Sequence, residues 1–405
     1  MTHRPVLPVA RARAAVRGDT NVAAVWIDVG RRSILAAMDA LVITRRELNR
    51  ATLARQLLLE RSTMSIPAAI EHLVGLQAQT PHTAYTGLWS RLEAFAPEAL
   101  SELIVGRRVV RLALMRGTIH MVTARDAWGL RPLVQPVLDR VQKTQFGKRL
   151  VGVDLDAVVA AGRAFVEAEP RTFKALGDHL LERWPGRDRF ALEQTIRTAV
   201  PLIQVPPRGL WGRSGPIAHT SIEAWLGAPP REPAGLDGLV TRYLGAFGPA
   251  SVMDAQAWCG LTRLADVFDR LRPGLLTFRD ESGRELFDLP EAPRPGPDVP
   301  APARFLYDFD NLLLSHADRT RVLSAEAADA VRPATQEPVS TFTLDGFVAG
   351  TWRVEREKPR GAATLTLRPI RPLSRRQTTD VTDQGAALLA FLAAKSTEHR
   401  IRVDP

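Results

Sequence analysis

Helical segments and short strand pairs follow one another in a repeated order along this chain of 405 residues. Three segments with apolar residues at helical spacing precede two short β-type runs around a turn, and the order then starts again. The first pair of strands is predicted at 108–115 and 118–123, on either side of Arg116-Gly117. The order occurs three times without close sequence repetition, so it predicts a tandem array of small mixed units.

Each unit is defined by the helices before its strands. In the first unit, helices are predicted at 44–60, from Ser65 to the turn at Gln77, at 81–95 and from Pro97, with a further helix at 124–141. In the second, they are predicted at 154–168, 172–183 and 189–200, with strands at 202–205 and 209–213. In the third, they are predicted at 236–247, 251–260 and 262–271, with strands at 275–279 and 285–289. Helices followed by a two-stranded wing is the order of a winged helix-turn-helix.

The predicted fold class is mainly α with small β-hairpins (α+β): tandem winged helix-turn-helix units plus a small C-terminal α+β domain. Pro-rich stretches at 228–236 and 290–303 are predicted linkers. The predicted domains are winged helices at 41–150, 151–230 and 231–292, and an α+β domain at 293–405 with strands at 341–356 and 363–368 and a helix at 383–395. Residues 1–40 are expected to be disordered or to precede the true start of translation, for which Met38 is the candidate.

The charge balance indicates an anionic partner. The chain has 54 Lys and Arg against 44 Asp and Glu, a formal charge of +10. Such an excess favours a partner like nucleic acid, although an arginine-rich composition explains the choice of arginine over lysine. The single cysteine, Cys259, excludes an internal disulfide and a cysteine-based zinc site. We expect no metal, no cofactor and no membrane segment, and a cytoplasmic location.

The most informative stretch is Leu73–Leu92, LVGLQAQTPHTAYTGLWSRL. Its centre, Gln77-Ala78-Gln79, is predicted to lie in a turn between two helices, the second beginning at Thr80-Pro81 as N-cap and first helical residue. A glutamine in such a turn usually caps a helix or faces water. A short loop held by packing on both sides is also where a functional site is expected.

This stretch resembles the Gln-apolar-Gln segment of the AlkZ-like DNA glycosylases, bacterial winged-helix proteins that excise alkylated purines. Three more segments agree with that family in the same order: MRGTIHMVTARD at 115–126, LLLSHADRTRVL at 312–323 and DGFVAGTWRV at 345–354. The resemblance implies that Gln77 and Gln79 are catalytic and supports the tandem winged-helix architecture. A related branch of the family has Asp at the second glutamine position, and this chain does not.

Glutamine suits this chemistry because an N7-alkylated purine carries a positive charge and is already a competent leaving group. The enzyme then needs a positioned water and stabilisation of an oxocarbenium-like transition state more than a strong acid. An amide carbonyl accepts a hydrogen bond from water but does not titrate near neutral pH. We therefore expect both glutamine side chains to be free to hold water.

Further candidate residues are expected to contact DNA. Arg116, Thr118 and His120 lie at the first wing, where a structural role for the histidine and a turn-capping role for the arginine are the alternatives. The segment 312–323 contributes three further candidates, His316, Arg319 and Arg321. The equally favoured alternative is a structural loop ordered by an ion pair between its aspartate and an arginine. The basic segment 353–376 has a formal charge of +6, and its hairpin carries the four candidates Arg353, Arg356, Lys358 and Arg360.

Two classes of function fit these features. The first is a monofunctional DNA glycosylase that hydrolyses the N-glycosidic bond of cationic N7- or N3-alkyl purines, including bulky adducts or crosslinks, in damaged double-stranded DNA. The second is a non-catalytic winged-helix DNA-binding protein or transcriptional regulator. A regulator normally presents a basic recognition helix, whereas the helix after Pro81 is nearly uncharged. We therefore favour the enzyme, acting as a monomer.

Overall fold

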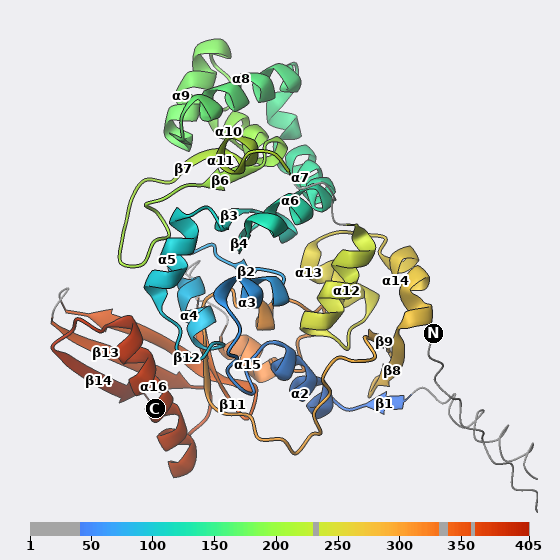
Figure 1. The fold of residues 1–405 in the computed structure, drawn as a ribbon, viewed down its shortest axis with the longest axis vertical. Helices are drawn as coiled ribbons and strands as arrows, with labels where there is room; N and C mark the ends of the chain where they lie inside the picture. Colours follow the sequence, from blue (N-terminus) through green and yellow to red (C-terminus); the bar gives the residue numbers. More distant parts are fainter. Residues whose placement is uncertain (1–40, 230–234, 332–338, 358–360, 405) are drawn as a thin grey trace, which may run out of the picture. The chain divides into compact units, whose positions relative to one another are not determined.

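The structure is a computed structural model that describes residues 41–229, 235–331, 339–357 and 361–404 (Figure 1). Apart from Leu41, all of these residues belong to the compact unit Val42–Pro405. The predictions for residues 1–40 and for Lys358 and Arg360 lie outside the described residues. Helices and short sheets both contribute substantially, which confirms the α+β class.

The first helices surround the Gln77 segment. They are α2 (Arg45–Arg55), α3 (Ile66–His72), α4 (Thr83–Trp89) and α5 (Pro97–Val105). The capping box of Thr44 and Glu47 at α2 is present. The predicted start of the next helix at Thr80-Pro81 is wrong: α4 begins at Thr83, because the Thr80 hydroxyl donates to the Asp308 carboxylate instead of capping a helix.

A six-stranded sheet has the order β2-β4-β3-β6-β7-β5. Its strands are β2 (Leu76–Gln77), β3 (Val109–Ala113), β4 (Ile119–Thr123), β5 (Arg171–Thr172), β6 (Leu202–Gln204) and β7 (Ala218–Ser221). The strands of the first two predicted wings are thus joined, with Leu112 of β3 opposite Ile203 of β6. Gln77 lies in an edge strand of this sheet rather than in a turn between helices.

The second strand of the second wing was predicted at 209–213, and this is wrong. Gly209 and Gly212 have φ angles of 89° and 65°, a left-handed conformation that interrupts a strand. The segment forms turns, and the strand that pairs with β6 is β7, further along the chain.

Several helices follow the first predicted wing, and those labelled α8, α9 and α10 lie above β6 and β7 in Figure 1. They are α6 (Ala124–Leu133), α7 (Gln135–Val141), α8 (Leu155–Ala168), α9 (Phe173–Arg183), α10 (Arg189–Ala199) and α11 (Ile222–Leu226). The single helix predicted at 124–141 is broken between α6 and α7, near Pro132 and Pro136. A π-helical turn η2 (Gln142–Phe146) and a 3₁₀ turn η3 (Gly147–Leu150) follow α7.

The third helical trio has the predicted order. It consists of α12 (Leu236–Phe247), α13 (Val252–Cys259) and α14 (Ala265–Leu271), followed by the hairpin β8 (Leu276–Asp280) and β9 (Glu285–Asp288). A strand from the start of the described chain, β1 (Leu41–Ile43), completes a sheet of order β1-β8-β9.

The C-terminal region is a five-stranded sheet of order β10-β11-β12-β13-β14 with one long helix, α16. Its elements are β10 (Arg304–Leu306), β11 (Ser340–Leu344), β12 (Phe347–Arg356), β13 (Ala362–Pro369), α16 (Arg375–Leu392) and β14 (Glu398–Val403), with a short helix α15 (Ala325–Ala330) before β11. The strand predicted at 341–356 is two strands, because Asp345-Gly346 forms the tight turn typical of a hairpin. The last helix starts at a capping box of Ser374 and Gln377, eight residues before its predicted start.

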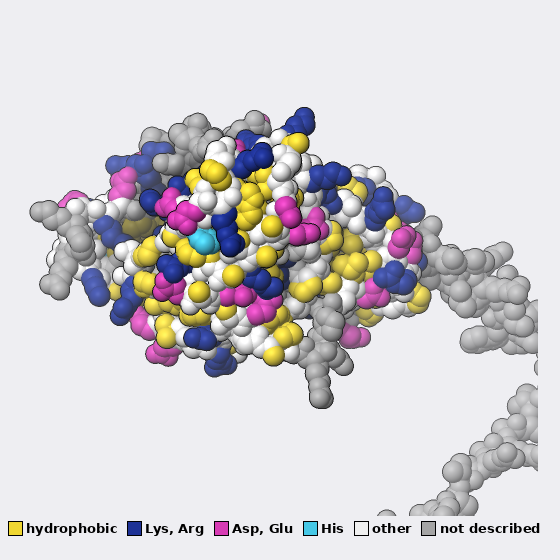
Figure 2. All heavy atoms as spheres, turned by 90° about the horizontal axis from the view of Figure 1, so that it is seen from above, with side chains coloured by type: hydrophobic (Ala, Val, Ile, Leu, Met, Phe, Trp, Pro, Cys, Tyr) yellow, Lys and Arg dark blue, Asp and Glu magenta, His cyan; other side chains and the backbone are white. Residues whose placement is uncertain are grey.

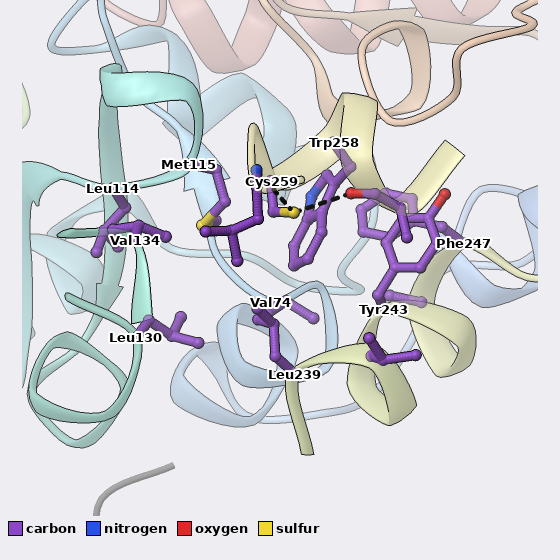
Figure 3. Packing of buried hydrophobic residues seen from close by; sticks show 14 of the residues in the cluster. Val74, Leu114, Met115, Leu130, Val134, Leu239, Tyr243, Phe247, Trp258 and Cys259 are labelled. Carbon is purple, nitrogen blue, oxygen red and sulfur yellow. Dashed lines mark hydrogen bonds between the residues drawn. The ribbon is translucent and has the colours of Figure 1, made fainter. Parts of the chain in front are cut away.

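The largest apolar core combines residues from the first and third helical regions (Figure 3), and Ile203 of β6 and Ile222 of α11 also belong to it. Leu114 and Met115 come from the first wing, and the rings of Tyr243, Phe247 and Trp258 come from α12 and α13. The predicted boundaries near 150, 230 and 292 remain predictions, and this core extends across two of them. None of the helices in the described ranges is long and apolar enough to cross a membrane.

Candidate active site

The Gln77-Ala78-Gln79 segment is held against β4 by backbone and side-chain hydrogen bonds. Gln77 lies opposite His120 in the antiparallel pair, and the Ala78 N–H donates to the Ile119 carbonyl at 2.8 Å. The Gln77 side chain is only 4% exposed, whereas Gln79 is exposed. Arg111 of β3 donates to the Ala78 carbonyl from the other side, at 2.6 Å. The segment is therefore rigidly placed.

The orientation of both glutamine amides is set by partners that only donate. Gln77 Oε1 accepts from Arg116 Nη2 at 2.6 Å, and Gln79 Oε1 accepts from the Ile119 N–H at 3.2 Å. A guanidinium or a backbone N–H has no acceptor, so each amide must turn its carbonyl oxygen toward it. The expectation that both side chains are free of protein contacts is therefore wrong. The two NH₂ groups, in contrast, have no hydrogen-bond acceptor among the residues that the structure describes.

Arg116 is the residue that connects Gln77 to the rest of the site. It has φ 56°, a left-handed conformation that few residues other than glycine adopt, at the turn between β3 and β4. Its Nη1 donates to the Trp258 carbonyl, while its Nη2 donates to Gln77. Burial lowers the pKa of Arg116 from its usual value. A partly buried positive charge thus polarises the Gln77 amide.

His120 and Tyr307 complete the surroundings of Arg116. Both are fully buried and close enough to Arg116 to feel its charge. His120 Nδ1 lies 3.0 Å from the Thr118 carbonyl oxygen, so Nδ1 carries the proton and Nε2 is an acceptor. Burial, followed by the Arg116 charge, lowers the pKa of His120 to about 3. His120 Nε2 and the Tyr307 hydroxyl have no partner among the described residues.

Two residues beside the candidate site, Tyr307 and Asp308, were not predicted from the sequence. Tyr307 and Asp308 follow β10, more than 220 positions after Gln77, and the Arg91–Asp310 ion pair together with the Ser90 hydrogen bond to the Phe305 carbonyl holds this segment against α4. Asp308 is 3% exposed and accepts from the Thr80 hydroxyl, and burial raises the pKa of its carboxyl group. Thr118, which was predicted, donates its hydroxyl to the Met115 carbonyl at 3.1 Å.

The segment 312–323 does not provide the predicted DNA contacts of His316 and Arg321. His316 is 4% exposed, and its Nε2 lies 3.0 Å from the Phe247 carbonyl. Arg321 is 5% exposed and donates to the Pro249 carbonyl at 2.9 Å. These side chains stabilise loops inside the molecule, and of the three predicted residues in this segment only Arg319 is exposed.

The predicted basic hairpin is less positive than its sequence suggests. Arg353 is exposed but lies 3.2 Å from Glu355, and Arg356 donates to the Leu392 carbonyl. Arg368 and Arg371 pair with Asp404 and Glu326. On the face drawn in Figure 2, Lys and Arg side chains are spread among acidic and apolar ones rather than gathered in one patch. A role of this hairpin in DNA binding remains a prediction.

Within the described ranges, no group of three or more His, Cys, Asp or Glu side chains is arranged to hold a metal ion. Cys259 is buried, its sulfur donates to the Ala255 carbonyl at 3.0 Å, and burial raises its pKa to about 11. The site thus consists of two oriented amides, one arginine, one neutral imidazole and one phenol.

Comparison with known proteins supports an assignment. A family model described as DNA glycosylase AlkZ-like matches residues 70–391. The interstrand DNA cross-link repair glycosylase of Streptomyces sahachiroi is 25% identical over 333 residues, which is 74% of this chain and 85% of that protein. The solved structure of Streptomyces sahachiroi DNA glycosylase AlkZ has a TM-score of 0.72 at 20% identity and covers 90% of this chain and 100% of its own, which establishes the common fold. The chain therefore belongs to the AlkZ-like family of DNA glycosylases.

Proposed function

We propose that this DNA glycosylase is monofunctional and hydrolyses the N-glycosidic bond of cationic N7- or N3-alkylated purines in double-stranded DNA, with Gln77 and Gln79 as its catalytic residues. The observation that supports this most is the fixed orientation of the two amides. Gln77 Oε1 has one lone pair directed to Arg116, and Gln79 Oε1 has one directed to the Ile119 N–H. Each oxygen keeps a second lone pair for a water hydrogen.

The proposed reaction needs no strong acid. The C1′–N bond breaks, and its electron pair moves to the purine and cancels the positive charge of the alkylated base. A water held at the amide oxygens attacks C1′ and then loses its proton to solvent. The carbonyl dipoles face the developing positive charge at the sugar, which is a contribution made mainly in the transition state.

The neighbouring residues agree with a pre-activated leaving group. His120 is neutral at physiological pH because its pKa is about 3, so it is not available as an imidazolium acid. No carboxylate among the described side chains hydrogen-bonds to Gln77 or Gln79. No lysine occurs in the four segments that resemble the family, so we propose that the enzyme does not form an imine with the sugar.

We further propose that the substrates include bulky adducts or crosslinks, because a relative is named an interstrand DNA cross-link repair glycosylase. The helix trios with their strands are proposed to act as winged-helix DNA-binding units. The trio α12, α13 and α14 followed by the β8–β9 hairpin supports this most closely. We propose a monomer as the active form.

The test is base release from DNA with one N7-methylguanine, measured under single-turnover conditions, with uracil-containing DNA as the comparison. We expect release of the methylated base and persistence of uracil, since a neutral base needs an acid to leave. Rapid uracil release would show that the mechanism is wrong. Cleavage of the DNA strand at the lesion without alkali treatment would contradict the monofunctional assignment.

The role of the amide is tested by Gln77→Glu beside Gln77→Ala. A carboxylate retains an acceptor for Arg116 and for water but lacks the NH₂ group. If the carbonyl oxygen holds the water, Q77E should release base faster than Q77A. Equal loss in both variants would assign the effect to the NH₂ group instead.

A further inference from the structure

A pocket of about 190 Å³ lies beside the turn between β3 and β4. Its polar walls come from that turn, from η2 and from α10, and consist of Arg116, Gln145, Gln194, Arg197 and Thr198. Gly117, with φ 73°, contributes a bare backbone, where an added Cβ would lie 3.4 Å from Leu138. The pocket therefore has an apolar floor and several hydrogen-bonding groups around it.

Three of these polar groups have no partner in the part of the chain that the structure describes. The Gln194 amide, in a residue only 9% exposed, forms no hydrogen bond, and neither do the Gln145 amide and the Arg197 guanidinium. Arg197 also lacks an ion pair with any described carboxylate, and burial is the cause that lowers its pKa. Burying a cation without a counter-charge is unfavourable. Arg197 is half-buried, and its unused N–H groups together with the two amides can donate to an anion in the pocket.

The chemistry of the pocket selects its ligand. A guanidinium presents N–H donors in a fork that matches the oxygens of a phosphate, and a side-chain amide adds further donors. A cationic alkylated purine would be repelled by Arg197 and Arg116, which have no carboxylate beside them among the described residues. The pocket therefore suits an anionic group and not the damaged base.

The segment beside the pocket points to a polyanion rather than a small free anion. Residues 140–149 (RVQKTQFGKR) contain Arg140, Lys143, Lys148 and Arg149 and no acidic residue, hence 4 − 0 = +4. Lys143 and Lys148 form no ion pair with a described residue, and Arg149 lies 3.5 Å from Asp188. Several cations on consecutive helical turns next to a pocket for one anion suit a polyanion such as DNA better than a single small anion.

We propose that this pocket binds a backbone phosphodiester of DNA next to the damaged nucleotide, with Arg197 and Gln194 as its ligands. Arg116 both lines the pocket and donates to Gln77 at 2.6 Å, so the phosphate site and the candidate catalytic amide share one residue. The assignment to DNA rests on the glycosylase function proposed above. A phosphate held here fixes the strand relative to Gln77 without contacting the base.

The first test is DNA affinity as a function of salt for Arg197→Gln, using undamaged duplex so that no reaction is needed. We expect roughly tenfold weaker binding and a slope of log affinity against log salt that falls by about one, as for the loss of one phosphate contact. Arg183→Gln, an exposed arginine at the end of α9, is the control with the same change in net charge. Arg197→Lys, which keeps the charge, should restore the slope.

The second test places one neutral methylphosphonate at each position around a lesion. For the natural protein, the methylphosphonate should weaken binding at one position. With DNA substituted at that position, Arg197→Gln should cause no further loss of affinity. Gln194→Leu should show the same coupling, to a smaller extent. Additive losses at every position would overturn the proposal. The proposal would also be overturned if R197Q and R183Q have the same DNA affinity while both have the melting temperature of the natural protein.

Inorganic phosphate distinguishes a free anion from DNA. Thermal stabilisation by phosphate in the natural protein but not in R197Q, together with a flat methylphosphonate scan, would assign the pocket to a free anion and overturn the DNA assignment. Failure of the enzymatic proposal is recognised separately. If the salt slope falls in R197Q but the natural protein releases no base from any substrate, only the proposed enzymatic function is refuted. If the natural protein releases base normally but the slope is unchanged in R197Q, only the proposed phosphate site is refuted.

Discussion

The candidate active site and the pocket beside it share Arg116 but differ in how their polar groups are satisfied. Around Gln77 the hydrogen bonds are mostly made within the protein: both glutamine oxygens, Arg116 Nη1 and Arg116 Nη2 have partners. In the pocket, Gln194 and Arg197 have none among the described residues. The first arrangement positions groups before the substrate arrives, and the second leaves donors for a ligand.

Arg321 shows why burial alone does not separate these cases. It is as buried as the residues of the active site and carries the same charge, but the Pro249 carbonyl and the Thr52 hydroxyl accept its hydrogen bonds. The Asp254 carboxylate also lies close enough to raise its pKa against the effect of burial. The donors of Arg321 are used inside the protein, whereas those of the half-buried Arg197 have no partner among the described residues and can reach a ligand.

The largest expected effect is on catalysis in Gln77→Ala. Single-turnover base release should fall by about a hundredfold, since one positioned group is worth on the order of 3 kcal/mol in the transition state. Because Arg116 loses its acceptor, we expect a loss of about 1 kcal/mol in the free energy of unfolding as well. Gln79→Ala should lose activity with a smaller loss of stability, because Gln79 is exposed and water can take its place as acceptor for the Ile119 N–H. Preserved base release in both variants would leave the two glutamines a structural role only.

The second prediction concerns Arg321→Gln. Its removal leaves the buried Pro249 carbonyl without this donor and the Asp254 carboxylate without a nearby positive charge, which should lower the free energy of unfolding by about 2 kcal/mol. DNA affinity of the folded fraction should not change, since the side chain does not reach the surface. Urea titration and binding at one salt concentration measure the two quantities. A loss of affinity without a loss of stability would contradict the comparison with Arg197.

The third prediction concerns pH. Burial lowers the pKa of His120 and of His219 to about 3, below the usual value near 6.5 that each regains on unfolding. Below pH 6.5 the unfolded chain therefore binds protons that the folded protein does not. Stability should be complete above pH 6.5 and fall by about 1.4 kcal/mol per pH unit for each histidine down to about pH 3.

The rate of base release should respond differently to the same change in pH. Neither glutamine titrates, and His120 stays neutral, so the single-turnover rate should be flat between pH 6 and pH 8. Measuring unfolding and base release across this range separates the two effects. A bell-shaped rate profile would indicate a titrating acid or base that the mechanism lacks.

The smallest expected effect is that of Arg353→Ala combined with Arg356→Ala. Both side chains are exposed, and each already has a partner in the protein. Because these partners compete with a phosphate, affinity should fall less than in R197Q, and the salt slope should fall by less than one. A larger loss than in R197Q would make this hairpin, and not the pocket, the main phosphate contact.

The local features of the fold were predictable from the sequence, because they depend on neighbours in the chain. The capping box at Thr44, the exact span of 236–247 and the β8–β9 hairpin follow from periodicity and turn residues. The Asp345-Gly346 pair is also typical of a hairpin turn. The alternation of apolar residues on both sides of it led to the prediction of one continuous strand. What the sequence does not contain is pairing between distant strands, as between Gln77 and His120 or between β3 and β6.

The candidate site was predictable only in part for the same reason. The motif locates Gln77 and Gln79, but the partner of Gln77 is an arginine 39 positions away, and Tyr307 and Asp308 come from the other end of the chain. Polarity also misled at 312–323, where His316 and Arg321 are buried although their residue types are usually exposed. Composition does not reveal which charged side chains find partners inside a protein.

The shared core of Figure 3 has a thermodynamic consequence. Because Leu114 and Met115 pack in the same cluster as Tyr243, Phe247 and Trp258, the first and third helical regions lose their apolar contacts together. Calorimetry should then record one cooperative heat-absorption peak for both regions rather than separate melting events. The predicted units at 41–150 and 231–292 would then unfold together, and a fragment ending near residue 150 would lack part of the apolar core on which it depends.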